Sequence, residues 1–119
     1  SLNRITMKHF NIKEFDCSET GENEMNPEFL KLLDDLREAC GFPFHVTSGY
    51  RSPRHSIEAA KKVPGTHAHG IATDIRITDA HQRFKVIELA LLAGFTGIGV
   101  AKGFLHLDTR KTTPVIWAY

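Results

Sequence analysis

Two short segments alternate apolar and polar side chains, and this alternation constrains the fold more than any other feature. Within residues 71–77 and 104–108, isoleucine, threonine or leucine occupies every second position. The positions between them hold Ala72, Asp74, Arg76, Phe104, His106 and Asp108. Successive side chains along a strand point to opposite faces of the sheet. We therefore predict two strands, each with one apolar face and one face that carries polar groups.

Two longer segments have the periodicity and the end signals of helices. Asn26-Pro27-Glu28 combines a capping side chain, a proline suited to the first helical position and an acid in the first turn. Apolar residues then recur at helical spacing up to Ala39, before Gly41. A second helix is predicted from about Thr78-Asp79 to Gly94, and a shorter one over 53–62 that ends before Val63-Pro64-Gly65.

The order of these segments indicates the fold class. Strands are predicted at 44–48, 71–77, 97–100, 104–108 and 115–118. Helices do not alternate regularly with strands, so a parallel β-α-β sheet is not indicated. We predict an α+β fold in which helices pack on one face of a mainly antiparallel sheet.

Length and charge set limits on organisation and partners. The chain has 119 residues and a formal net charge of +1, which predicts one domain, over 8–119, and gives no electrostatic footprint for nucleic acid or a membrane surface. Residues 1–7 are interpreted as an N-terminal extension or a cloning remnant. No secretory signal is recognised, and we expect a monomer. Whether Cys17 and Cys40 form a disulfide is left open.

The polar face of the predicted strands carries candidate metal ligands. If the isoleucine and leucine faces meet the helices, Asp74, His106 and Asp108 emerge together on the open face. His67 lies just upstream in Gly65-Thr66-His67-Ala68-His69-Gly70, where glycines permit a tight turn toward Asp74. Two imidazoles and one carboxylate suit zinc and leave a fourth position for water. Solvated polar residues on an exposed sheet face are the alternative, since no HExxH signature is present.

Three motifs in order resemble a known family. They are Ser48-Gly49-Tyr50-Arg51-Ser52, then His67-x-x-Gly70-x-Ala72-x-Asp74, then Phe104-Leu105-His106-Leu107-Asp108. Over residues 8–119 the chain is similar to the zinc D-alanyl-D-alanine carboxypeptidases of the lysostaphin and D-Ala-D-Ala metallopeptidase group. Its compact size resembles the short peptidoglycan peptidases that bacteriophages often encode.

The resemblance implies roles for individual residues. His67, Asp74 and His106 would hold one Zn²⁺, and Arg51 would act in catalysis by steadying a substrate carbonyl or carboxylate. Ser48 and Tyr50, in the same motif as Arg51, are expected to bind substrate.

The resemblance also implies a substrate and a place of action. The substrates would be peptidoglycan stem peptides that contain D-amino acids, cut as a D-Ala-D-Ala carboxypeptidase or an L-Ala-D-Glu-type endopeptidase. The enzyme would act on periplasmic or cell-wall peptidoglycan, and a phage enzyme would reach it through a holin or within a virion.

One departure from the family leaves the general base open. Relatives carry an acid three residues before the last zinc histidine, where this chain has Gly103. Asp108 is the first candidate for the base, and its alternative role is to orient His106. His69 and Glu58 are weaker candidates.

Because of Gly103, a catalytically idle zinc-bound module that binds cell wall or serves in a virion is the alternative function. Trp117 and Tyr119, near the end of the chain, are expected to close the core rather than line a cleft.

Overall fold

One five-stranded sheet organises the protein, whose structure is a computed structural model that describes residues 6–63 and 65–119. The strand order is β1-β2-β4-β3-β5, and all neighbours are antiparallel except the parallel pair β3 and β5. The predicted α+β class is confirmed, and every predicted strand is present to within one residue at each end. The strands are β1 (His45–Ser48), β2 (Ala72–Arg76), β3 (Gly97–Val100), β4 (Phe104–Asp108) and β5 (Val115–Ala118).

Both long helices are confirmed together with their end signals. In α1 (Pro27–Cys40) the Asn26 side chain accepts a hydrogen bond from the backbone N–H of Phe29, and Gly41 ends the helix at φ 80°. In α3 (Ala80–Ala93), Asp79 caps the start and Gly94 ends the helix at φ 99°. Glycine is favoured at both ends because a side chain in this left-handed conformation is strained.

The helical prediction for residues 53–62 is wrong in extent. Only α2 (Ser56–Ala59) is helical, and the flanking residues form turns and bends. The His55 side chain caps α2, and Glu19 accepts hydrogen bonds from the Ser56 backbone and hydroxyl. Side-chain contacts to another loop therefore fix this segment more than helical periodicity does. A short 3-10 helix, η2 (Ile12–Phe15), was not predicted.

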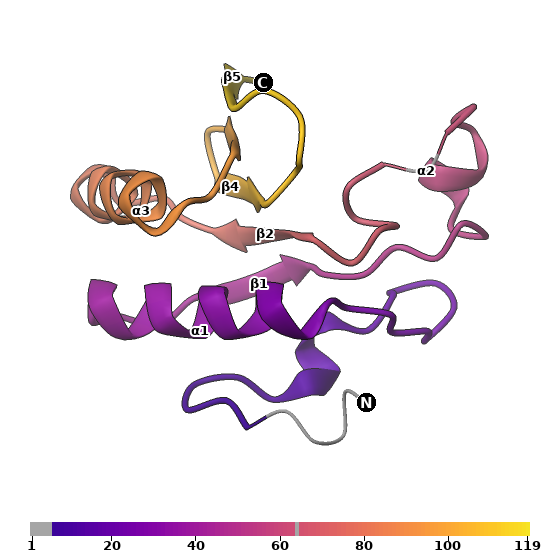
Figure 1. Cartoon of the computed structure of the whole chain (residues 1–119), viewed down its shortest axis with the longest axis horizontal. Coiled ribbons are helices and arrows are strands. Elements are labelled where there is room, and N and C mark those ends of the chain that lie inside the picture. The colour runs from indigo at the N-terminus through magenta and orange to yellow at the C-terminus, as the bar shows by residue number, and fades with distance from the viewer. Residues whose placement is uncertain (1–5, 64) are drawn as a thin grey trace.

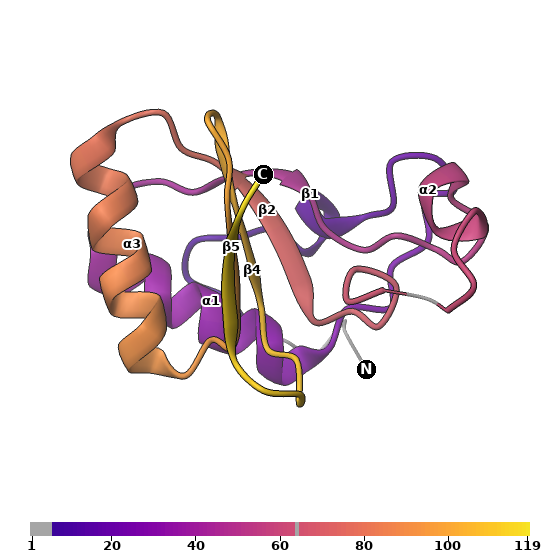
Figure 2. The same cartoon turned by 90° about the horizontal axis from the view of Figure 1, so that it is seen from above.

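The two long helices cover one face of the sheet (Figures 1 and 2). Helices α1 and α3 contact each other. In Figure 2, α3 lies on one side of the strands and α2 on the other, while α1 runs beneath the strands from the α3 side. The buried core includes apolar residues from these helices, the strand residues Ile75, Ile98, Leu105 and Leu107, and residues of the segments before α1 and around β1. The isoleucine and leucine face is thus the covered face, as predicted, and the polar face is left for the site.

Several remaining predictions concern the ends of the chain and its cysteines. Residues 1–5 of the predicted extension, and Pro64, lie outside the described residues, whereas Met7 packs partly buried against the core. Cys17 and Cys40 are both buried and free, so they do not pair. Among the described helices, none has the length and apolar character that crossing a membrane requires.

Candidate metal centre

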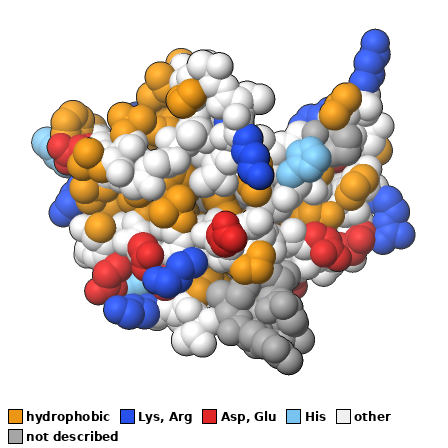
Figure 3. All heavy atoms as spheres, in the orientation of Figure 1, with side chains coloured by type: hydrophobic (Ala, Val, Ile, Leu, Met, Phe, Trp, Pro, Cys, Tyr) orange, Lys and Arg blue, Asp and Glu red, His pale blue; other side chains and the backbone are white. Residues whose placement is uncertain are grey.

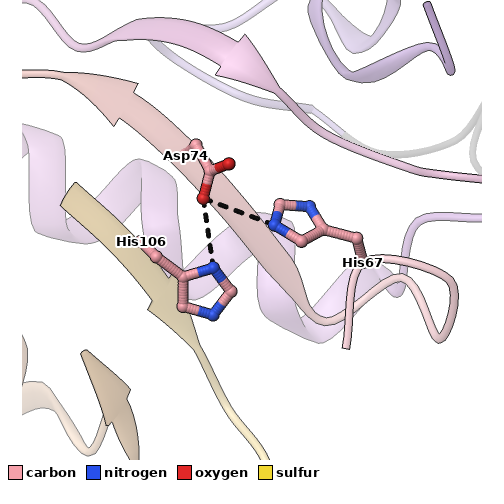
Figure 4. Close-up of side chains that lie close together, drawn as sticks. All are labelled: His67, Asp74 and His106. Carbon is pink, nitrogen blue, oxygen red and sulfur yellow. Dashed lines mark hydrogen bonds and ion pairs between the residues drawn. The ribbon is translucent and has the colours of Figure 1, made fainter. Parts of the chain in front are cut away.

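The three predicted ligands converge on one point (Figure 4). His67, Asp74 and His106 each offer one ligand atom, and these atoms all lie within 4.8 Å of one another. One carboxylate oxygen, Asp74 Oδ1, lies 3.3 Å from His67 Nε2 and 3.1 Å from His106 Nδ1. All three residues are buried. The three side chains therefore form a single candidate site.

Strand pairing places two of the ligands, and a turn places the third. Asp74 on β2 is the direct partner of His106 on β4, so both side chains leave the sheet on the same face. His67 reaches them from the turn that precedes β2, where Gly70 has φ 73°. A side chain at Gly70 would also lie 2.2 Å from the backbone oxygen of Glu24. Glycine at position 70 is thus required both for the turn and for its close packing.

The second ring nitrogen of each histidine already has a partner. His67 Nδ1 lies 2.8 Å from the carbonyl oxygen of Gly49, and His106 Nε2 lies 2.7 Å from Asp108 Oδ2. Both partners are acceptors, so these nitrogens carry the proton. The lone pairs then lie on His67 Nε2 and His106 Nδ1, which are the two nitrogens that face Asp74. This is the arrangement that metal-ligating histidines adopt.

The distances from Asp74 to the two imidazole nitrogens fit zinc. In a tetrahedral site with zinc–ligand distances of about 2.0–2.1 Å, neighbouring ligand atoms lie about 3.3 Å apart. The distances of 3.3 Å and 3.1 Å from Asp74 to the two imidazole nitrogens agree with that value. Two nitrogens and one carboxylate oxygen are also a donor set that zinc accepts, with one position left open.

The Asp108 carboxylate lies behind His106, away from Asp74. Its side chain is fully buried, and one oxygen contacts Nε2, the ring nitrogen turned away from the ligand cluster. In the sheet, Asp108 pairs with Ala72 on one side and Gly97 on the other. A Cβ at Gly97 would lie 2.2–2.4 Å from the carboxylate. Small neighbours therefore make the space in which Asp108 sits.

Arg110 and Trp117 support this arrangement, and the sequence reasoning gave neither of them such a role. Arg110 donates to both oxygens of Asp108, at 3.0 Å from Nε and 2.7 Å from Nη2. Its guanidinium lies over the ring of Trp117, which in turn packs against the His106 ring at 5.2 Å between centroids. The expectation that Trp117 closes the core is therefore wrong, because β5 presents it to the open face, where it lines the cleft. Tyr119 is 69% exposed and lines the same cleft.

The carboxylates of the site are stabilised in their charged form. Burial opposes ionisation of Asp74, but its close contacts with the His106 and His67 rings outweigh burial and hold the pKa of Asp74 well below its usual range. Burial likewise opposes the charge on Asp108, and hydrogen bonds from His106 and Arg110 lower its pKa. For His106, the two carboxylates outweigh burial and raise the pKa.

A cleft of about 420 Å³ opens over the ligand cluster. Figure 3 shows the surface hollowed between β5 and the segment around α2. Arg51 lines this cleft, with Nη2 3.5 Å from Asp74 Oδ2, and is 19% exposed. The structure thus brings Arg51 beside the three ligands.

The other residues of the Arg51 motif do not line the cleft. Tyr50 is 6% exposed and belongs to the hydrophobic core, so the expectation that it binds substrate is not supported by its position. Ser48 is half-buried beside Asp74 in the sheet, and its backbone oxygen accepts a hydrogen bond from Thr73. Within this motif, Arg51 faces the cleft, whereas Tyr50 packs in the core behind it.

The other candidates for the base lie outside the ligand cluster. His69 lines a neighbouring hollow rather than the metal cleft. Glu58 is buried behind Arg51, 3.9 Å from its guanidinium. Gly103 lies between β3 and β4 with nothing within 4 Å of an added Cβ. Among the described residues that line the cleft, Asp74 is the only carboxylate.

Comparison with known proteins identifies the family. No curated protein sequence matches the chain significantly. The sequence profile of the family described as Peptidase M15 matches residues 3–108, a span that contains Arg51 and all three clustered ligands. Members of this family are zinc-dependent peptidases. The match covers most of the chain and agrees with the His67, Asp74 and His106 cluster, and the chain therefore belongs to the Peptidase M15 family.

Proposed function

We propose that this protein is a zinc metallopeptidase that hydrolyses amide bonds in peptidoglycan peptides containing D-amino acids. The observation that carries the proposal is the convergence of His67, Asp74 and His106, within 4.8 Å, beneath an open cleft. Family membership supports peptidase chemistry on substrates of this general kind. The finer proposal is a D-Ala-D-Ala carboxypeptidase or an L-Ala-D-Glu-type endopeptidase that acts in bacterial or phage-driven cell-wall degradation.

Zinc bound by these three residues would acidify a water molecule and polarise the substrate carbonyl. The chain's own groups would do the rest. Arg51 would donate hydrogen bonds to the carbonyl oxygen, because its guanidinium lies beside Asp74 in the cleft wall. The ring of Trp117 would keep water from one side of His106, against which it packs.

We further propose that Asp108 orients His106 rather than acting as the general base. Its oxygens contact His106 Nε2 and the Arg110 guanidinium, and its side chain is fully buried. A general base must reach the proton that it abstracts directly or through one water. Asp108 instead fixes the tautomer that directs the Nδ1 lone pair of His106 toward the cluster.

The test is digestion of purified peptidoglycan and defined muropeptides by the zinc-loaded protein, with products identified by mass spectrometry. New peptide ends are expected, and the mass of each product shows which bond is cut. The matched Asp74→Asn variant should release none, because it loses a charged ligand. Wild-type protein that binds zinc stoichiometrically and yields no new ends would contradict the proposal.

A second function is favoured by one observation. Asp74 is the only carboxylate among the described residues that line the cleft, and Gly103 offers no side chain. A protein with zinc but no base would bind cell-wall peptides without cutting them. Saturable binding of muropeptides to the zinc-loaded protein, with no turnover, would support this idle binding module.

A further inference from the structure

The cleft above the ligand cluster is lined by more positive than negative side chains. Arg51, Lys61 and Arg110 line it, whereas Asp74 is its only carboxylate among the described residues. Arg110 is paired with Asp108 by three hydrogen bonds from its side chain, and Asp74 belongs to the metal set. Arg51 and Lys61 are therefore the cations of the cleft outside the Arg110–Asp108 pair.

A buried carboxylate holds these two cations on one wall. Glu58 Oε2 lies 2.7 Å from Lys61 Nζ and 3.9 Å from Arg51 Nη1, and the Glu58 side chain is fully buried. The other oxygen, Oε1, accepts a hydrogen bond of 2.8 Å from the Gly65 backbone N–H. Glu58 balances one of the two cations, and Asp74 Oδ2 lies 3.5 Å from Arg51 Nη2. With Asp74 committed to a bound zinc ion, this wall would keep a net positive charge.

The hydrogen bonds to Glu58 compensate for the cost of burying its charge. Burial opposes its ionisation, but the hydrogen bonds from Lys61 and the Gly65 N–H outweigh this and lower its pKa. Glu58 is therefore a fixed anion that positions Lys61, and it does not act as a proton carrier.

Lys61 keeps donors that are free to reach a ligand. An ammonium group has three donors, and in the structure Glu58 accepts from one of them. The Lys61 side chain is 40% exposed, compared with 19% for Arg51. A Cβ at residue 65 would lie 2.8 Å from Lys61 Nζ, so Gly65 leaves room for the ammonium at this place. Arg51 thus lies closer to the ligand cluster, and Lys61 lies farther out on the same wall.

We propose that Lys61, positioned by Glu58, forms with Arg51 a subsite for a free carboxylate of the substrate peptide. The inference rests on the proposed function and deepens it, because it selects peptides with a carboxylate near the bond that is cut. Charge-assisted hydrogen bonds to a carboxylate are stronger than neutral ones, and their geometry is directional at the Arg51 guanidinium. The carboxylate is either the C-terminal group of the peptide or one carried by an internal residue.

The experiment compares three versions of one D-Ala-D-Ala peptide. One has its C-terminal and internal carboxylates free, one has a C-terminal amide, and one has the internal carboxylate amidated. Each is titrated calorimetrically into zinc-loaded wild type, Lys61→Met and Lys62→Met, and kcat and KM are measured where cleavage occurs. Lys62 is the matched control, because it is the exposed next residue and does not line the cleft.

Wild type should bind the fully free peptide about tenfold more tightly than one of the two amidated peptides, as expected for about 1.4 kcal/mol from one charge-assisted contact. The amidation that weakens binding identifies the source of the carboxylate. Lys61→Met should lose this preference through a higher Kd and KM with little change in kcat, Lys61→Arg should restore part of it, and Lys62→Met should retain it.

Several outcomes separate this inference from the proposed function. Equal affinity of wild type for all three peptides, no binding of any of them, or a preference that survives in Lys61→Met would overturn the subsite. Cleavage that is independent of Lys61 would leave the peptidase proposal standing while removing the subsite. A Lys61-dependent binding preference without cleavage of any peptide would support the subsite and defeat the peptidase proposal.

Discussion

The two histidines of the site are each fixed by a contact on the side of the ring away from Asp74. His67 donates to the Gly49 carbonyl, and His106 donates to Asp108. The backbone partner is neutral, whereas Asp108 is an anion held by Arg110. The two ligands are therefore oriented by different means, and His106 depends on a side chain that can be replaced.

Replacing Asp108 by asparagine tests this dependence. Asp108→Asn removes the charge behind His106 and permits the wrong tautomer, so zinc affinity should fall about 10- to 100-fold. Competition with a zinc-binding dye measures the affinity. Asp35→Asn on the exposed face of α1 is the control and should bind zinc like wild type. An Asp108→Asn protein with unchanged zinc affinity and no turnover would instead support a role for Asp108 as the general base.

The sequence pattern predicted the three candidate metal ligands better than it predicted the residues that pack around them. Alternation within 71–77 and 104–108 was sufficient to put Asp74, His106 and Asp108 on one face, and the turn glycines indicated how His67 could join them. The role of Arg110 was not predictable, because it depends on how the chain turns after β4. The core position of Tyr50 was not predicted, because a place in a motif carries no information on which way a loop side chain points.

Among the elements, β3 is unusual because it contains two glycines in four residues. Gly97 faces the Asp108 carboxylate, and a Cβ at Gly99 would lie 2.8 Å from the rings of Trp117 and Tyr119. Glycine weakens a strand unless another group needs the space. On the open face, other groups do need the space. The absence of side chains on β3 makes room for Asp108, which contacts His106, and for the rings of Trp117 and Tyr119, which form the aromatic wall of the cleft.

Substituting the glycines separates this packing effect from a general effect of glycine. Gly97→Ala should lower the free energy of unfolding by about 1–3 kcal/mol, because the new methyl group would overlap the Asp108 carboxylate. Gly103→Ala, in the turn after β3, meets nothing within 4 Å and should be neutral or slightly stabilising. Urea unfolding measures both. Equal effects of the two substitutions would show that the space beside Asp108 is not needed.

The position of β5 explains why the aromatic wall was missed. The sequence predicted a strand at 115–118, but not that it would pair in parallel with β3 and bring Trp117 beside Gly99. Parallel neighbours are joined by a crossover, so their pairing cannot be read from local turn signals. Packing of Trp117 against His106 is a consequence of this long-range pairing.

For the whole molecule, the sheet has two faces with different tasks. Helices α1 and α3 bury one face in the core, while the other carries the ligand cluster, the cleft and the α2 segment. Two ligands come from β2 and the turn that precedes it, and the third, His106, comes from β4, 32 residues after Asp74. A metal ion held by all three would therefore link separate parts of the chain.

Zinc should accordingly stabilise the folded state. A free zinc concentration of 100 times the Kd would add about 2.7 kcal/mol, provided that the unfolded chain does not bind zinc. Thermal unfolding with zinc and with excess chelator measures the shift in Tm. His67→Gln should show a much smaller zinc-dependent shift, whereas His45→Gln, on the exposed start of β1, should behave like wild type. A zinc-dependent shift that is equal in all three proteins would place the ion elsewhere.

The location of the bound ion is the most direct test of the account. Crystals of the zinc-loaded protein, measured at the zinc absorption edge, should give one strong anomalous peak about 2.0–2.2 Å from His67 Nε2, His106 Nδ1 and a carboxylate oxygen of Asp74. A peak at any other place, or these three side chains directed away from one another in the zinc-loaded crystal, would contradict it.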